Sequence, residues 1–175
     1  NKNTTLTANT PFKEWKLAYG GEDLFATTKP SAYLEGQTVR IPSFEFTIGD
    51  KTGLMSNPGE SGMFLASMWS KTGLKTFLSL YGRQVVLSQN TLASKCTWGD
   101  NNFLICAVPK YIPRKTEGLP DDWFQGRFLF NDSLFIVDSK TADTLPLYSF
   151  DESLKLSFDI TNIAISRGNA LIAFT

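Results

Sequence analysis

Histidine is absent from this sequence of 175 residues. Its absence excludes the commonest general base and the commonest metal ligand, and with them every Ser-His-Asp or Cys-His nucleophile arrangement. The sequence also has no glycine-rich phosphate-binding loop and no zinc-ligand spacing. We therefore expect a protein that is not an enzyme and that holds no metal and no cofactor.

A charge surplus and a long apolar run are also lacking. The 17 basic residues are balanced by 17 acidic ones, which argues against nucleic acid as a partner because phosphate binding needs a basic surplus. No segment approaches the roughly 18 apolar residues of a transmembrane helix. The sequence starts at Asn1 without an initiator methionine or a signal peptide, so we expect a mature or trimmed chain, and the presence of a membrane anchor upstream of Asn1 is left open.

The only two cysteines, Cys96 and Cys106, flank the turn signal Gly99–Asn102. Apolar, β-favouring residues on both sides of this turn predict a β-hairpin. With Asn101 at its centre, the cysteines face each other across the strands. Their Cβ atoms would lie about 4.5–5.5 Å apart, which a non-hydrogen-bonded pair can close into a disulfide. We predict this disulfide and an oxidising compartment, periplasmic or extracellular; the alternative is two buried thiols in a reduced protein.

The aromatic residues, including 14 Phe, favour strands over helices. The length fits one domain spanning 1–175, with residues 1–9 as a flexible lead-in. One short helix is expected from Thr10 to Gly20, because Phe12, Trp15 and Tyr19 recur at helical spacing. A single helical turn is expected at 119–125, where Asp121 and Asp122 would mark its start.

Alternating apolar residues between closely spaced turns predict about eight to ten short strands. The segment 63–69 also fits two turns of helix, but the turns that bracket it favour a strand. Loops are expected at 20–36, 49–62, 109–120 and 139–146. Strands are expected within 37–48, 63–69, 74–80, 84–87, 91–97, 103–108, 154–160, 163–165 and 170–175, with a second hairpin at 127–138 and no internal repeat.

This pattern predicts an all-β, single antiparallel domain. A lipocalin-like barrel is favoured over a two-sheet sandwich, because consecutive hairpins give up-and-down neighbours and the short helix could close one end. Trp98, Leu104 and Val108 would share one face of the central hairpin with the disulfide. That face is either ordinary core or, in a barrel, the lining of a cavity for an apolar ligand.

Three stretches resemble a known family. Trp98–Ile105, a Trp followed by Asp-Asn and an apolar strand, resembles the signature of lipocalin-like barrels and is most similar to periplasmic ToxS-like proteins. Phe12–Lys16 resembles the Glu-Trp segment that follows the membrane anchor in that family. Phe158–Phe174, two apolar strands around a basic-Gly-Asn turn, resembles its closing hairpin. The three stretches together cover about a sixth of the chain.

The resemblance implies the periplasmic part of a membrane-anchored protein that binds the periplasmic domain of a membrane-bound transcription regulator. It also implies an amphipathic ligand, such as a bile salt or a fatty acid, at the barrel mouth. The alternative is a structural or adhesive β-sandwich, such as a pilus-associated or phage surface protein, that binds its partner through the loops 109–120 and 49–62. The expected ligand-lining residues are Trp98, Leu104 and Val108, followed by Phe44, Phe46 and Phe158.

Overall fold

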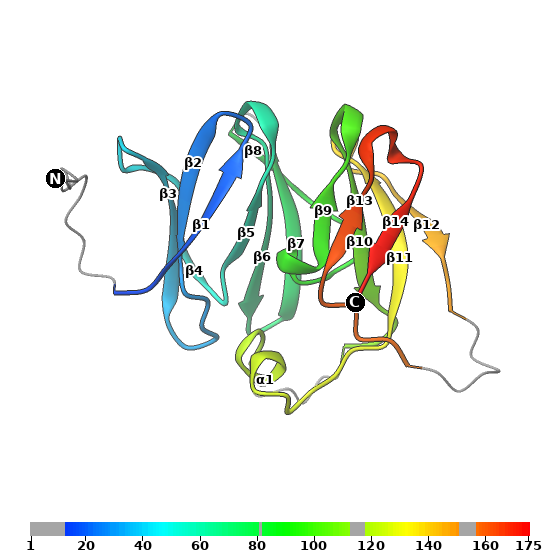
Figure 1. Ribbon diagram of the computed structural model, residues 1–175. Coiled ribbons are helices and arrows are strands. Elements are labelled where there is room, and N and C mark those ends of the chain that lie inside the picture. Colours follow the sequence, from blue (N-terminus) through cyan, green and yellow to red (C-terminus); the bar gives the residue numbers. More distant parts are fainter. Residues whose placement is uncertain (1–12, 81, 113–117, 151–156) are drawn as a thin grey trace, which may run out of the picture.

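The computed structural model describes residues 13–80, 82–112, 118–150 and 157–175, so the expected lead-in 1–9 lies outside the described residues. The described chain is all-β and antiparallel, with three four-stranded sheets and one two-stranded sheet arranged side by side as a stack (Figure 1). The predicted barrel is wrong. Each sheet ends in an open strand instead of closing on itself, and the arrangement resembles a sandwich with additional layers.

Within each sheet the strands follow one another in sequence order as a meander. The first sheet contains β1 (Trp15–Gly20), β2 (Asp23–Thr28), β3 (Glu35–Ile41) and β4 (Glu45–Thr52). The second contains β5 (Met55–Pro58), β6 (Phe64–Ser70), β7 (Gly73–Leu80) and β8 (Arg83–Val86). The third contains β9 (Cys96–Trp98), β10 (Phe103–Pro109), β11 (Asp132–Asp138) and β12 (Thr144–Tyr148), and the fourth β13 (Ile163–Ile165) and β14 (Ile172–Phe174).

The helices are short. The only α-helix of the described chain, α1 (Asp121–Phe124), confirms the predicted helical turn and lies at the lower edge in Figure 1. Single 3-10 turns connect strands elsewhere: η1 (Glu60–Gly62), η2 (Ala93–Lys95), η3 (Asp100–Asn102) and η5 (Arg167–Asn169).

The three meanders repeat one another although no sequence repeat is visible. Their first strands begin at Trp15, Met55 and Cys96, about 40 residues apart. First strands of neighbouring sheets also lie beside each other, β1 next to β5 and β9 next to β13. The chain therefore builds one four-stranded unit three times and then begins a fourth unit with two strands.

Packing between the sheets explains the long apolar runs of the second and third sheets. On β6, Phe64 faces the first sheet, where its ring meets that of Phe25 edge-on at 4.7 Å. The next residue, Leu65, belongs instead to the core cluster shared with Leu104 of the third sheet. Because both faces of β6 are buried, its sequence is apolar at nearly every position, and the prediction of a strand at 63–69 is confirmed.

The predicted helix at 10–20 is wrong, because the part of it that the structure describes forms β1. Trp15, Leu17 and Tyr19 alternate with Lys16 and Ala18, which is a strand pattern. The helix prediction used the helical spacing of Trp15 and Tyr19 and did not take Leu17 into account. The expected loop at 20–36 is also wrong, because this segment contains β2.

Four other expectations are corrected. Within the expected hairpin 127–138 only β11 is a strand, and the turn expected at Asn131–Ser133 is where β11 begins. The expected loop 139–146 contains the start of β12, and the expected loop 49–62 contains the end of β4 and all of β5. Residues 157–160 of the expected strand 154–160 form no strand, and 154–156 lie outside the described residues.

Candidate functional site

The predicted disulfide is confirmed. Cys96 of β9 lies opposite Cys106 of β10, with the two Cα atoms 4.1 Å apart and the sulfurs bonded. Asn101 takes a left-handed conformation (φ 62°) in the turn between the strands, as its place at the centre of the hairpin requires. Trp98 pairs with Leu104 in the same register.

The face predicted to line a cavity is packed between the second and third sheets. Leu104 and Val108 are almost fully buried in the core cluster, and Trp98 packs against that cluster. The Trp98 indole N–H donates to the Asn57 carbonyl oxygen at 3.2 Å. The Trp98 ring lies so close to Gly59 that a Cβ atom built on Gly59 would be only 2.6 Å from the ring atoms. The structure thus brings these three predicted residues together.

The three predicted phenylalanines lie elsewhere and apart from one another. Phe44 stands in the turn between β3 and β4, with φ 57°. Phe46 is 65% exposed on the outer face of the first sheet. Phe158 stacks on Phe150 at a centroid distance of 4.4 Å, beside the fourth sheet. No single site contains all six residues.

A buried ionic centre lies beneath the third sheet and was not predicted. Lys95 and Asp132 are both fully buried. The Lys95 Nζ atom donates to Asp132 Oδ2 and Asp159 Oδ1, each at 2.5 Å. The ammonium group also lies over the Phe130 ring, 4.5 Å from its centroid. The Trp123 indole N–H of α1 donates to Asp159 Oδ2 at 2.9 Å.

This centre ties together three connections that are distant in sequence. Lys95 ends the connection from β8 to β9, Trp123 lies in the one from β10 to β11, and Asp159 lies in the one from β12 to β13. Burial raises the pKa of Asp132, and the Lys95 ammonium offsets part of that rise. The Ile160 amide donates to Asp132 Oδ2 at 2.8 Å, whereas Asp132 Oδ1 is buried without a hydrogen-bond partner among the described residues. The arrangement is that of a structural cross-link.

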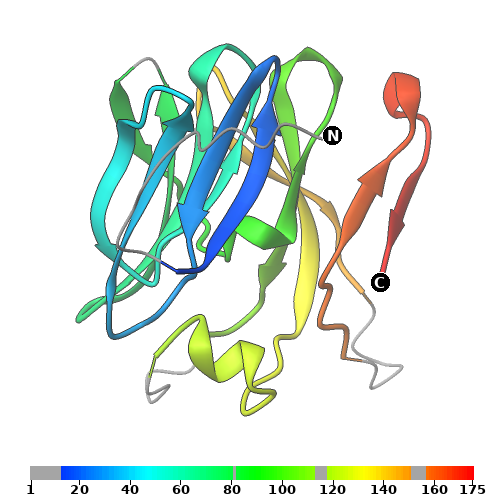
Figure 2. The same cartoon turned by 60° about the vertical axis from the view of Figure 1, so that its left-hand side comes forward.

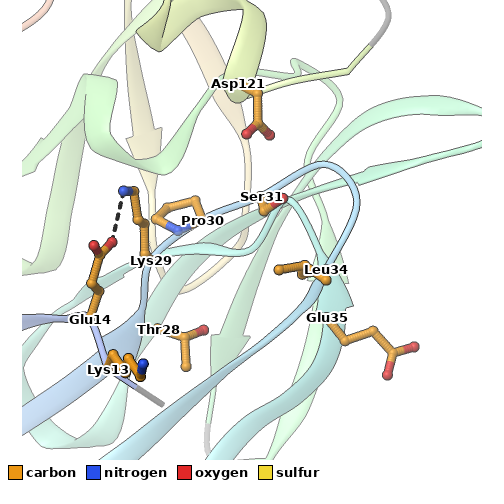
Figure 3. Close-up of a pocket in the computed structure, with 9 residues that line it drawn as sticks. All are labelled: Lys13, Glu14, Thr28, Lys29, Pro30, Ser31, Leu34, Glu35 and Asp121. Atoms are coloured by element: carbon orange, nitrogen blue, oxygen red, sulfur yellow. Dashed lines mark ion pairs between the residues drawn. The ribbon is translucent and has the colours of Figure 1, made fainter.

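A surface pocket of about 380 Å³ lies at the end of the first sheet, between the β2–β3 loop and α1 (Figure 3). Lys29 turns toward Glu14, 2.7 Å away, and this exposed partner raises the Lys29 pKa. Asp121 Oδ2 accepts the Ala32 amide hydrogen. Lys29, Glu14 and Asp121 are therefore engaged with neighbouring groups, and among the described residues no cluster of His, Cys, Asp or Glu could hold a metal.

The fourth sheet exposes backbone hydrogen-bonding groups. Ser166 bonds to Leu171 and Asn162 to Thr175 across the β13–β14 hairpin. Bonded and non-bonded pairs alternate in an antiparallel ladder. The N–H and C=O groups of Ile172 and Phe174 therefore point away from β13, toward a side where the described chain provides no further strand.

An apolar surface lies beside this open edge. Leu145 and Tyr148 of β12 pair with Ile136 and Leu134 of β11, so they share the face of the third sheet that the fourth sheet covers. They are nevertheless 62% and 57% exposed. Figure 2 shows the hairpin as a separate narrow layer beside the third sheet. We call the open β14 edge and the side chains of Leu145 and Tyr148 together the strand-docking site.

The outer edges of the other three sheets are protected against further pairing. Strand β4 carries Glu45, Asp50 and Lys51, β8 carries Arg83, and β12 contains Pro146. Charges and proline are usual means of blocking edge-to-edge pairing. Strand β14, Ile-Ala-Phe, has neither a charge nor a proline. Sequence reasoning missed this site because it took 139–146 as a loop.

No family model, no curated protein and no solved structure matches this chain. Among the described residues, none of the helices has the length and apolar character needed to cross a membrane.

Proposed function

We propose that this chain is a non-catalytic binding domain of an oxidising compartment, periplasmic or extracellular, that binds a partner protein by accepting one of its β-strands. The observation that carries the proposal is the strand-docking site, where unpaired backbone groups of β14 lie next to exposed apolar side chains of β12. The disulfide supports the choice of compartment, because such bonds persist where thiols are not kept reduced.

Strand addition explains both parts of this site. Backbone hydrogen bonds to Ile172 and Phe174 would supply affinity, and every second side chain of the added strand would rest on Leu145 and Tyr148. The partner segment is therefore an extended strand with alternating apolar residues. A strand in this place would also give the fourth sheet the neighbour that the second strand has in each of the other sheets.

This proposal fits the structural or adhesive alternative better than ligand capture at a barrel mouth, since the described chain has no closed barrel. The periplasmic domain of a membrane-bound regulator, which the ToxS-like resemblance implies, remains a prediction and would be one partner of the required kind. The contact surface differs from the expected loops 109–120 and 49–62, because it is formed by strands.

Site-specific photocrosslinking tests the proposal. A benzophenone amino acid replaces Leu145, and the purified protein is irradiated with soluble extract from the source organism. We expect a specific crosslinked protein. The matched position is Val86, which is 62% exposed on β8, an edge of another sheet, and should give no such product.

Two further substitutions decide whether backbone pairing is involved. Phe174→Pro removes an N–H that points to the open edge and none that bonds to β13, whereas Phe174→Leu keeps it. We expect the Leu145 crosslink to be lost in the first variant and retained in the second, with similar circular dichroism melting curves. A crosslink that survives Phe174→Pro, or that also forms at Val86, would contradict strand addition.

A further inference from the structure

The hairpin turns of the second and third sheets lie at the upper edge in Figure 1. A second cavity, separate from the strand-docking site, is lined by residues at these turns. Its volume is about 500 Å³, within the range of roughly 300–1,000 Å³ of small-molecule sites. We call it the rim cavity. It is lined by Met63, Leu80, Arg83, Val85, Asn102, Ser139, Lys140 and Thr141.

The charge in the rim cavity has one sign. Arg83 and Lys140 line it and no acidic residue does. Neither cation has an ion-pair partner in the described part of the chain. The nearest acid in sequence, Asp138, is occupied with its own turn, because its Oδ1 atom accepts the Lys140 amide hydrogen at 2.7 Å. This contrasts with the pocket of Figure 3, where Lys29 and Glu14 neutralise each other.

A buried hydroxyl provides the second, independent observation. Ser139 is fully buried, and its Oγ atom has no hydrogen-bond partner among the described residues. Leaving a buried polar group unpaired costs about 1–3 kcal/mol, so such groups call for an explanation. Its backbone is held in place by the bond from the Ser139 amide to the Asn102 carbonyl oxygen at 3.3 Å. Because Ser139 lines the rim cavity, a shift of the side chains around it would open this hydroxyl to a ligand oxygen.

We infer that the rim cavity binds a small amphipathic anion. Arg83, Lys140 and the Ser139 hydroxyl would hold its carboxylate, sulfate or phosphate head, since each can donate to an oxyanion. Met63, Leu80 and Val85 would contact its apolar body. A rigid wall on each side, one from each sheet, would fix the head group relative to the body.

Octanoate is the probe, and its amide and inorganic phosphate are the matched compounds. The amide keeps the apolar body without the charge, and phosphate keeps the charge without the body. Binding is followed by NMR shifts of the backbone amides of Asn102, Ser139 and Thr141. We expect octanoate to shift these amides and to bind at least about tenfold more tightly than either matched compound, a factor equal to about 1.4 kcal/mol.

Substitutions then locate the head group. Arg83→Gln with Lys140→Gln should weaken octanoate binding at least about tenfold, while Lys16→Gln on β1 removes one positive charge from a distant sheet and should have no effect. Ser139→Ala should weaken binding without lowering the melting temperature, because the hydroxyl has no partner to lose. Equal binding of octanoate and octanamide, or octanoate binding unchanged in the Arg83 and Lys140 double variant, would overturn the inference. These outcomes do not depend on whether β14 accepts a strand.

Discussion

The first and third sheets share the same four-strand meander but differ in what covers them. In the third sheet Leu104 and Ile105 point to opposite faces, and both are buried, at 0% and 4% exposure. In the first sheet the described residues cover only the inner face, so Phe25 is buried whereas Leu17 and Phe46 are 60% and 65% exposed. The same local pattern therefore supports different amounts of burial, and position in the stack decides how much each apolar residue contributes to stability.

The largest expected effect is on the ionic centre below the third sheet. Lys95→Met would leave Asp132 and Asp159 close together without their cation. We expect a loss of about 3–5 kcal/mol, as for other buried pairs that lose one partner. Urea unfolding followed by tryptophan fluorescence measures it, with the surface change Lys16→Met as control. A loss below about 1 kcal/mol, the range of exposed ion pairs, would show that the centre does not act as a cross-link.

The next effect compares the two sheets directly. Leu104→Ala should destabilise the fold by about 2–5 kcal/mol, because it opens a cavity between buried layers. Leu17→Ala should change stability by no more than about 0.5 kcal/mol, because that side chain already meets solvent. Thermal and urea unfolding of both variants give the comparison. Similar losses at the two positions would mean that the outer face of the first sheet is covered in solution.

The disulfide is expected to matter less than the packing around it. It closes a loop with a sequence separation of 10, and loops of this length are stabilised by roughly 2–3 kcal/mol. Cys96→Ser should lower stability by that amount while the chain still folds. The wild type should melt at a lower temperature in reductant, and the variant should not respond. Identical melting of the wild type with and without reductant would contradict this.

The smallest effect concerns pH. Burial raises the Asp132 pKa in the folded state above its unfolded value, so the folded chain binds this proton more tightly. The stabilisation from this group is full below the unfolded pKa and is lost as the pH rises through the folded pKa. Unfolding free energies of the wild type and Asp132→Asn, measured from acidic to neutral pH, should therefore differ in slope. The wild type should lose more stability with rising pH; parallel curves would show that the pKa is not raised.

Local patterns predicted much of the structure. The spacing of Cys96 and Cys106 around one turn was sufficient to predict the hairpin, its register and the disulfide, because all three depend on residues within one hairpin. The strands β6, β7 and β8, the helical turn α1 and the last strand β14 were also signalled by nearby turns and alternation.

The features that sequence reasoning missed all depend on distant residues. Short antiparallel hairpins occur in barrels, sandwiches and stacks alike, and only packing between sheets, such as the core cluster that contains both Leu65 and Leu104, distinguishes them. Lys95 lies 37 positions from Asp132 and 64 from Asp159, so no spacing rule connects them. The one available signal was a lysine between the apolar residues Leu92 and Ala93 and the strand that begins at Cys96. The rim cavity likewise combines turns from two sheets.

Lys95 and Cys96 are adjacent in sequence and take part in two different cross-links, one ionic and one covalent. A slip of one residue would place Lys95 opposite Cys106 and turn Cys96 toward the two carboxylates. The disulfide of Cys96 and the ion pairs of Lys95 would then both be lost. While the chain folds, only one alignment of this segment can satisfy both, so two neighbouring side chains select the correct arrangement of the third sheet from its near alternatives.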